Sequence, residues 1–266
     1  MTMKLDLRDK KAFICDMDGV LYHGNRLLEG AMAFVEWLQN SGKKFLFLTN
    51  SSERSPRELR EKLSRLGIEV TEDHFYSSAQ ATAAFLASQK PGCTAYVIGE
   101  GGLINAIYNA GLAMNDVNPD YVVVGETHSY NYQKLCHAVQ LVHKGARLIG
   151  TNPDVSGPTE HGLAPATGAL IAPVEMVTGS KAYFVGKPNP LIMRHALKKL
   201  ECQREETVIV GDRMDTDIIA GMEAEIETVL VLSGVTARED LRRFAYQPHH
   251  VLPNVGELSS ALSNSH

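Results

Sequence analysis

Four short apolar runs in this chain each end in polar residues, and this pattern constrains the fold more than any other feature. The runs cover residues 12–15, 44–48, 182–185 and 207–211. Short continuous apolar runs are typical of strands that are covered on both faces, as in a parallel sheet. Between the runs, strand-like and helix-like segments alternate along the chain. We therefore expect an α/β fold built around a parallel sheet.

The first run ends in the tetrad Asp16-Met17-Asp18-Gly19, which places two carboxylates one residue apart. Alternate side chains of an extended chain lie on the same face, so Asp16 and Asp18 can point at one reacting atom if the chain turns at Gly19. One carboxylate could attack phosphorus while the other protonates the leaving oxygen. Asp and Gly are also common in turns at strand ends, and the tetrad alone fits that structural role equally well.

Hydrogen-bond donors follow the second run, and a cation follows the third. The donors are those of Thr49, Asn50 and Ser51. They could bind phosphate oxygens, or they could cap the helix predicted to begin near Pro56. Lys187 could neutralise a carboxylate and a phosphate together, although a lone Lys is usually a solvated surface residue. Each segment indicates chemistry only in combination with the others.

Acidic residues follow the fourth run: Asp212 comes directly after it, and Asp215 and Asp217 come next. Beside the first two carboxylates, Asp212 would complete a Mg²⁺ site, because Mg²⁺ prefers hard oxygen ligands. The alternative is an acidic N-terminus for a helix over residues 218–222, which the helix dipole favours. Asp217 fits this alternative better than Asp212 does. We expect Asp217 to support the metal site without binding the ion, and the sequence leaves Asp215 open for the same role.

Together the four segments resemble the haloacid dehalogenase (HAD) superfamily. Its pattern is an acidic DxD strand end, a Thr or Ser strand end, a Lys and a late acidic GD motif. The runs CDMDGVLYHG, FLTNSS, VGKPNP and VGDRMDTDI resemble those of the NagD-type phosphatases of subfamily IIA, in the same order and strand context. The resemblance extends over nearly the whole chain.

The resemblance implies hydrolysis through an aspartyl-phosphate intermediate. Asp16 attacks phosphorus, while Asp18 protonates the departing alcohol and then takes a proton from the hydrolytic water. Asp16, Asp212 and the backbone carbonyl of Asp18 are expected to bind Mg²⁺. Thr49 binds a transferring oxygen, and Lys187 offsets the negative charge around Asp16. The residues expected to bind phosphate or substrate are Met17, Gly19, Asn50, Ser51, Asn152 and Asp154.

The segment between the second and third motifs has its own alternation of strands and helices, enough for a separate α/β domain. Residues 1–79 and 182–266 are predicted to form a Rossmann-like catalytic core, and residues 80–181 an inserted lid. NagD-type relatives imply the same arrangement, with a type C2 cap. A lid would contact the leaving group, so its loops would select the substrate. The first candidate loop is residues 151–154, which could equally be an ordinary surface turn.

Composition agrees with this interpretation. A formal charge of −5 gives no support to a surface for a nucleic acid polymer. Four cysteines form no CxxC pair, which predicts neither a zinc motif nor a disulfide framework. No stretch approaches the length of a membrane span. We expect a cytoplasmic enzyme that acts on a small phosphorylated metabolite, and a homo-oligomer is compatible with the sequence.

Two other functions use similar residues. Phosphomutases retain both carboxylates of the first motif, so the motifs do not separate them from phosphatases; the NagD-like cap favours hydrolysis. Phosphoacceptor modules also use strand-end acids, Thr, Lys and Mg²⁺, but need no long insertion before the Lys. The presence of Asp18 argues against a dehalogenase, since expulsion of halide needs no acid. The leading substrates are nucleoside 5′-monophosphates such as UMP or GMP, followed by sugar phosphates.

Overall fold

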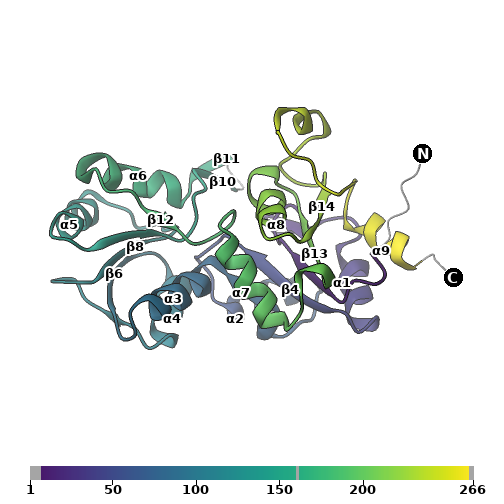
Figure 1. Ribbon diagram of the computed structural model, residues 1–266, viewed down its shortest axis with the longest axis horizontal. Coiled ribbons are helices and arrows are strands. Elements are labelled where there is room, and N and C mark those ends of the chain that lie inside the picture. The colour runs from purple at the N-terminus through teal and green to yellow at the C-terminus, as the bar shows by residue number, and fades with distance from the viewer. Residues whose placement is uncertain (1–6, 160–161, 264–266) are drawn as a thin grey trace. The chain divides into compact units, whose positions relative to one another are not determined.

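The computed structural model describes residues 7–159 and 162–263, which divide into two compact units. Unit 1 contains Met1–Thr49, Arg60–Tyr76 and Met193–His266, and unit 2 contains Asn50–Leu59 and Ser77–Ile192. Each unit has its own sheet with helices against it (Figure 1). The chain thus passes from unit 1 to unit 2 and back twice.

Unit 1 is built on a six-stranded sheet with the order β15-β14-β13-β1-β4-β5. The pairings of β1 with β13 and β4, and of β14 with β13 and β15, are parallel. β1 and β13 are buried along their whole length, which explains why both sequences are continuously apolar. The strands are β1 (Ala12–Cys15), β4 (Lys44–Thr49), β5 (Phe75–Ser77), β13 (Thr207–Gly211), β14 (Glu227–Val231) and β15 (His250–Leu252), with a hairpin of β2 (Tyr22–His23) and β3 (Arg26–Leu27).

Helices connect these strands. Apolar residues of α1 that recur at helical spacing are buried, and Phe34 packs edge-on against Phe13 of β1. α2 and α7 each run across a boundary between the units. The helices are α1 (Ala31–Asn40), α2 (Pro56–Arg65), α7 (Pro190–Leu200), α8 (Ile219–Glu223) and α9 (Val255–Ser263), with 3₁₀ turns at Glu72–His74, Arg204–Glu206 and Arg238–Arg243 and a π-helical turn, η3, at Met214–Ile218.

Unit 2 has a parallel five-stranded sheet with the order β12-β9-β8-β6-β7. Figure 1 shows α5 and α6 on one face of this sheet and α3 and α4 on the other. The strands are β6 (Thr94–Ile98), β7 (Ala113–Met114), β8 (Tyr121–Val124), β9 (Arg147–Gly150) and β12 (Tyr183–Phe184), with a hairpin of β10 (Ser156–Thr159) and β11 (Gly162–Pro165). The helices are α3 (Ser78–Gln89), α4 (Gly101–Asn109), α5 (Tyr132–His143) and α6 (Thr167–Thr178).

One strand lies in a different sheet from the one that the sequence pattern indicates. The apolar run before Lys187 is predicted as a strand of the catalytic core, but β12 pairs with β9 of unit 2. Both β12 and β9 are short, and the side chain of Phe184 lies over Gly150, whose missing Cβ makes room for the ring. The predicted domain limits near residues 80 and 181 stay a prediction.

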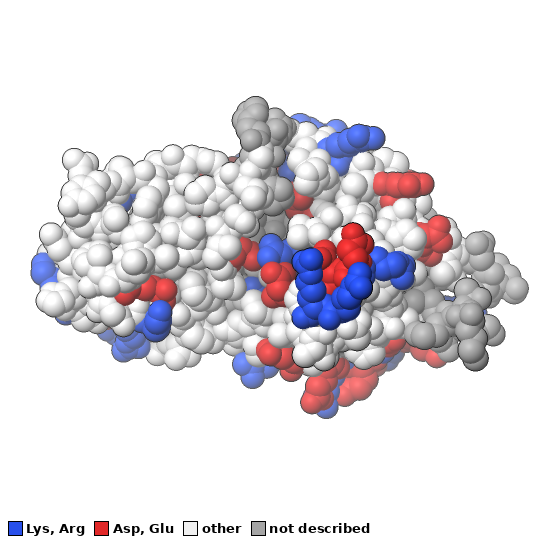
Figure 2. Space-filling view, turned by 90° about the horizontal axis from the view of Figure 1, so that it is seen from above, with Lys and Arg blue, Asp and Glu red and all other residues white. Residues whose placement is uncertain are grey.

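Charged side chains of both signs lie on the surface (Figure 2), and the cysteines are unpaired. Figure 2 shows one face, on which Lys and Arg side chains lie next to Asp and Glu side chains without an extended region of one sign. Among the described residues, no helix is both long and apolar enough to cross a bilayer. The four cysteines are free thiols. Cys15 is fully buried, and burial, followed by the charge of Asp16, raises the pKa of its thiol far above the usual value.

The partly buried carboxylate of Glu227 links Lys10 to His250 at the starts of β14 and β15, and it gives a testable pH dependence. Glu227 lies 2.7 Å from Lys10 Nζ and 2.7 Å from His250 Nε2. Partial burial alone would raise the pKa of Glu227, but the hydrogen bonds from Lys10 and His250 outweigh it and hold that pKa below 4.5. Its stabilising effect is therefore complete above about pH 4.5 and is lost as the pH falls through the lower pKa of the folded state.

We expect Glu227→Gln to lower the free energy of unfolding near neutral pH by about 1–2 kcal/mol, because a charged hydrogen-bonded acceptor is lost. The difference from the wild type should shrink below pH 4.5, where the wild-type carboxylate is itself protonated. Urea unfolding at a series of pH values measures the loss near neutral pH and its decrease in acid. Glu36→Gln on the exposed face of α1 is the matched control. An equal loss at acidic and neutral pH would contradict the ion-pair explanation.

Candidate active site

The tetrad of the first motif forms a tight turn at the end of β1. The backbone N–H of Asp16 donates to Val210 O (2.9 Å), which continues the pairing of β1 with β13. Beyond it, Met17 O accepts from Leu21 N (2.9 Å), and the side chain of Met17 is fully buried. Gly19 has φ +80°, a conformation that side-chain-bearing residues rarely adopt. The turn therefore depends on the glycine, and it fixes the two carboxylates at the sheet edge.

Three carboxylates gather at this edge of the sheet. Asp16, Asp212 and Asp217 each offer one oxygen, and these oxygens lie within 4.8 Å of one another. Asp212 and Asp217 are buried, each about 1% exposed, while Asp16 is partly exposed. Close carboxylates with little access to water repel one another unless a cation lies among them. Hard carboxylate oxygens fit a divalent ion such as Mg²⁺.

The structure places Asp217 in this group through the π-helical turn η3. Arg213 O accepts hydrogen bonds from both Asp217 N and Ile218 N (3.1 Å each), the second of which is the i→i+5 bond of a π-turn. The side chain of Asp217 then lies directly against Gly211, where a Cβ would overlap it. Its Oδ2 also accepts from Arg213 N (3.2 Å). Asp217 thus lies beside the predicted ligands Asp16 and Asp212, and its expected role in supporting the metal site stays a prediction.

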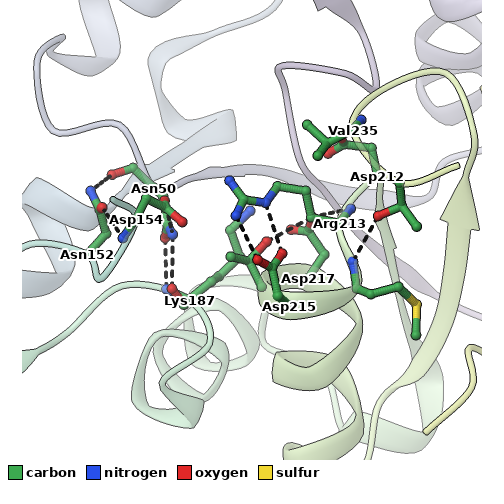
Figure 3. A network of polar contacts seen from close by, with 12 residues as sticks. Asn50, Asn152, Asp154, Lys187, Asp212, Arg213, Asp215, Asp217 and Val235 are labelled. Carbon is green, nitrogen blue, oxygen red and sulfur yellow. Dashed lines mark hydrogen bonds and ion pairs between the residues drawn. The ribbon is translucent and has the colours of Figure 1, made fainter. Parts of the chain in front are cut away.

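Asp215 lies apart from the three carboxylates. Its side chain is 57% exposed and pairs with the guanidinium of Arg213, at 2.9 Å (Figure 3). Of the two acids after Asp212, only Asp217 belongs to the acidic group within the described part of the chain.

Asp212 is held by the loop after β14. Val235 N donates to its Oδ2 (2.7 Å), and Thr236 N donates to its backbone oxygen (3.1 Å). Two glycines make room for the carboxylate: a Cβ on Gly234 would come within 2.5 Å of its Cγ, and one on Gly19 within 2.5 Å of its Oδ2. The orientation of this carboxylate is therefore fixed by close packing as well as by hydrogen bonds.

Asp18 has a different environment from Asp16. Its side chain is 48% exposed and lies 3.4 Å from His23 Nδ1. The partial burial raises its pKa, and the nearby His23 and Lys62 oppose that shift. Lys62 is itself largely buried, and its ammonium lies 3.7 Å from the centre of the Tyr22 ring. A raised pKa favours a carboxyl group that can donate a proton, which is the role predicted for Asp18.

The second motif is divided by a unit boundary. Thr49 is 9% exposed and ends β4 in unit 1. Asn50 and Ser51 begin the loop that follows, which belongs to unit 2. The side chain of Asn50 bonds to the backbone of Lys187 twice: its Oδ1 accepts from Lys187 N (2.8 Å), and its Nδ2 donates to Lys187 O (2.9 Å). Lys187 is 2% exposed. The predicted phosphate contact of Asn50 stays a prediction; the contact observed fixes Lys187.

The loop after β9 also binds Asn50. Asn152 is fully buried and donates from Nδ2 to Asn50 O (2.8 Å), and Asp154 Oδ2 accepts from Asn50 Nδ2 (2.9 Å). The observed partners of these two side chains are thus protein groups, which identifies a structural role for residues 151–154. Their predicted role in binding substrate stays a prediction.

The sequence patterns missed Glu126, which follows β8 after a single glycine. Its carboxylate accepts from Ser52 N (2.9 Å), from the Ser52 hydroxyl and from Asn152 Nδ2 (2.7 Å). A charged residue one glycine after the apolar run Tyr121–Val124 resembles the signal at the other strand ends, so it was available in the sequence.

Comparison with known proteins places these observations in a family. The sequence model of the haloacid dehalogenase-like hydrolase family matches residues 13–113. A second family model, described as HAD-hydrolase-like, matches residues 184–258. The chain is 46% identical over 248 residues to ribonucleotide monophosphatase NagD of Escherichia coli, covering 93% of this chain and 98% of that one. It is 42% identical to dihydroxyacetone phosphatase of Corynebacterium glutamicum, covering 93% and 90%.

Solved structures agree. The crystal structure of 4-nitrophenylphosphatase from Thermotoga maritima matches with a TM-score of 0.92 at 35% identity, covering 96% of this chain and 98% of that one. Identity of this extent over nearly the whole of both chains, together with the parallel sheets and the acidic strand ends, is sufficient to assign the family. The chain belongs to the haloacid dehalogenase-like hydrolases and, within them, to the NagD-like phosphatases.

Proposed function

We propose that this protein is a Mg²⁺-dependent phosphatase that hydrolyses small phosphate monoesters through an aspartyl-phosphate intermediate. The observation that carries the proposal is the group of three carboxylates formed by Asp16, Asp212 and Asp217. Relatives over nearly the full length are named as phosphatases, which supports hydrolysis over phosphoryl transfer within a substrate.

In this mechanism an oxygen of Asp16 attacks phosphorus as the bond from phosphorus to the leaving oxygen breaks. Asp18 donates a proton to that oxygen, and the alcohol leaves. Asp18 then takes a proton from a water molecule whose oxygen attacks the phosphorus, which releases inorganic phosphate and restores Asp16. Thr49 and Lys187 are proposed to stabilise the negative charge of the transferring group, with further phosphate contacts from Met17, Gly19 and the loop that begins at Asn50.

The chain's own oxygens would hold the metal ion. Asp16, Asp212 and the backbone carbonyl of Asp18 are the proposed ligands, with Asp217 beside them. When bound, Mg²⁺ would neutralise charge on the phosphate and on the carboxylates, which otherwise repel an anionic substrate. The burial of Asp212 and Asp217 supports this role, since buried carboxylates are normally paired or bound to metal.

The substrate class is a small phosphate monoester, with nucleoside 5′-monophosphates first and sugar phosphates second. The relatives are named for both kinds of ester, as a ribonucleotide monophosphatase and a dihydroxyacetone phosphatase. Tyr130 and Tyr132 follow β8, and a ring there could stack on a base, but the two side chains differ in environment. Tyr130 donates its hydroxyl to Leu170 O (2.7 Å) and packs in the core of unit 2, whereas Tyr132 is 79% exposed.

The test is phosphate release from a panel of nucleotides, sugar phosphates and triose phosphates, with Mg²⁺ and with EDTA. We expect Mg²⁺-dependent release from at least one ester, and none in EDTA. An isomerised sugar phosphate without free phosphate would identify a mutase. A stable phosphorylated protein without turnover would identify a phosphoacceptor module.

A further inference from the structure

A buried carboxylate in unit 2 has no role in the mechanism above. Glu126 lies at the end of β8, and three donors point at its two oxygens: Ser52 N, the Ser52 hydroxyl and Asn152 Nδ2. Burial raises the pKa of Glu126, while these hydrogen bonds oppose the shift. Because all three partners donate, the arrangement is satisfied by the carboxylate as an acceptor. A buried carboxylate is costly unless its hydrogen bonds are made, so Glu126 requires these donors in their observed positions.

Glu126 is linked to the loop of the second motif at two positions. It binds the backbone N–H of Ser52 directly. It also orients Asn152, whose Nδ2 donates both to Glu126 (2.7 Å) and to the backbone oxygen of Asn50 (2.8 Å). Close packing leaves little freedom here, since a Cβ on Gly125 would come within 2.5 Å of Ser52 Oγ. The backbone of residues 50–52 is thereby fixed at both ends.

The same hydrogen bonds continue to Lys187. The side-chain amide of Asn50 binds both the backbone N–H and the backbone carbonyl of Lys187. Gly186 allows this approach, because a Cβ there would come within 2.7 Å of Asn50 Oδ1. Within unit 2, an unbroken series of hydrogen bonds therefore leads from Glu126 through Asn152 and Asn50 to the backbone of Lys187.

We propose that Glu126 is a positioning residue for phosphate binding: through Ser52, Asn152 and Asn50 it fixes the loop of the second motif and the backbone of Lys187. The inference rests on the proposed phosphatase function. Glu126 would then affect binding of the phosphoryl group, which all substrates share. It would not affect binding of the leaving group, in which substrates differ.

The test is Glu126→Gln, which keeps the shape of the side chain but replaces one acceptor oxygen by an NH₂ group. That group must face either Ser52 N–H or the Asn152 amide, so one donor loses its acceptor. We expect kcat/KM to fall at least about fivefold, by the same factor for p-nitrophenyl phosphate and for a nucleoside monophosphate. The inhibition constant of inorganic phosphate should rise severalfold.

The inhibition constant separates positioning from folding, because a smaller folded fraction lowers the rate but leaves the affinity of the folded enzyme for phosphate unchanged. Glu100→Gln is the matched control: Glu100 also accepts two hydrogen bonds in unit 2, from Thr127 Oγ1 (2.8 Å) and His128 N (2.9 Å), and neither partner belongs to the loop of residues 50–52. We expect this control to keep both constants within about twofold of the wild type.

A second variant tests the series of hydrogen bonds itself. Asn152→Ala removes the donor shared by Glu126 and Asn50, and combined with Glu126→Gln it should cost less than the product of the two separate losses. An unchanged inhibition constant in Glu126→Gln would overturn the proposal, and so would a loss that differs between the two esters. Failure of the wild type to release phosphate from any ester would instead reject the proposed function.

Discussion

Asp16→Asn is expected to reduce phosphate release by a factor of at least about 1,000, because an amide oxygen is a poor nucleophile and no phosphoenzyme can form. The substitution keeps the size of the side chain at the end of β1. It also removes one of the three negative charges of the acidic group. Steady-state phosphate release measures the loss, and acid quenching with labelled substrate measures the phosphoenzyme directly.

The control for this prediction is Asp215→Asn, the same substitution in the same unit. Asp215 is exposed, pairs with Arg213 and lies outside the acidic group, so activity should stay within about twofold. If Asp16→Asn retained a tenth or more of the wild-type turnover, the nucleophile would have to be another residue.

Gly234→Ala is expected to lower the apparent affinity for Mg²⁺ by about 10- to 100-fold, the range found when residues that orient metal ligands are changed. The new methyl group would lie within 2.5 Å of Asp212 Cγ and 2.6 Å of its Cβ, so the carboxylate has to move. The hydrogen bond from Val235 N (2.7 Å) would be lost or lengthened at the same time. Activity measured against Mg²⁺ concentration gives the shift.

Gly101→Ala provides the comparison, because a Cβ at that position meets no atom within 4 Å and the backbone conformation suits any residue. If the substitution weakens Mg²⁺ binding, a high Mg²⁺ concentration should restore part of the activity of Gly234→Ala. Full activity at the wild-type Mg²⁺ requirement would show that Asp212 is not a ligand.

The sequence predicted the elements whose signals are local. The apolar runs at residues 12–15, 44–48 and 207–211 form β1, β4 and β13. The α/β class, the parallel sheets and the HAD family are confirmed. Each of these inferences depended on the period of apolar residues or on residues adjacent in the chain.

What the sequence did not predict depends on distant partners. The two residues of β12 carry no signal for which sheet they join, and only their pairing with β9 decides it. Among the described residues, the oxygens of Asp217, and not those of Asp215, come close to the distant Asp16 and to Asp212, and the π-turn at Met214–Ile218 makes this possible. Glu126 gains its importance from Ser52, 74 residues away. Motifs that are read one at a time therefore show where the acids lie, but not which of them meet.

The order of strands in unit 1 has a consequence for synthesis of the protein. β1 pairs with β4 on one side and with β13 on the other, and the chain from Ala12 to Thr207 must emerge before the second pairing can form. At about 5–20 residues per second this takes on the order of 10–40 s. The strands β6, β8 and β9 of unit 2 emerge during that interval. The open apolar edge of β1 therefore makes the nascent chain a candidate for chaperone binding until its last third is translated.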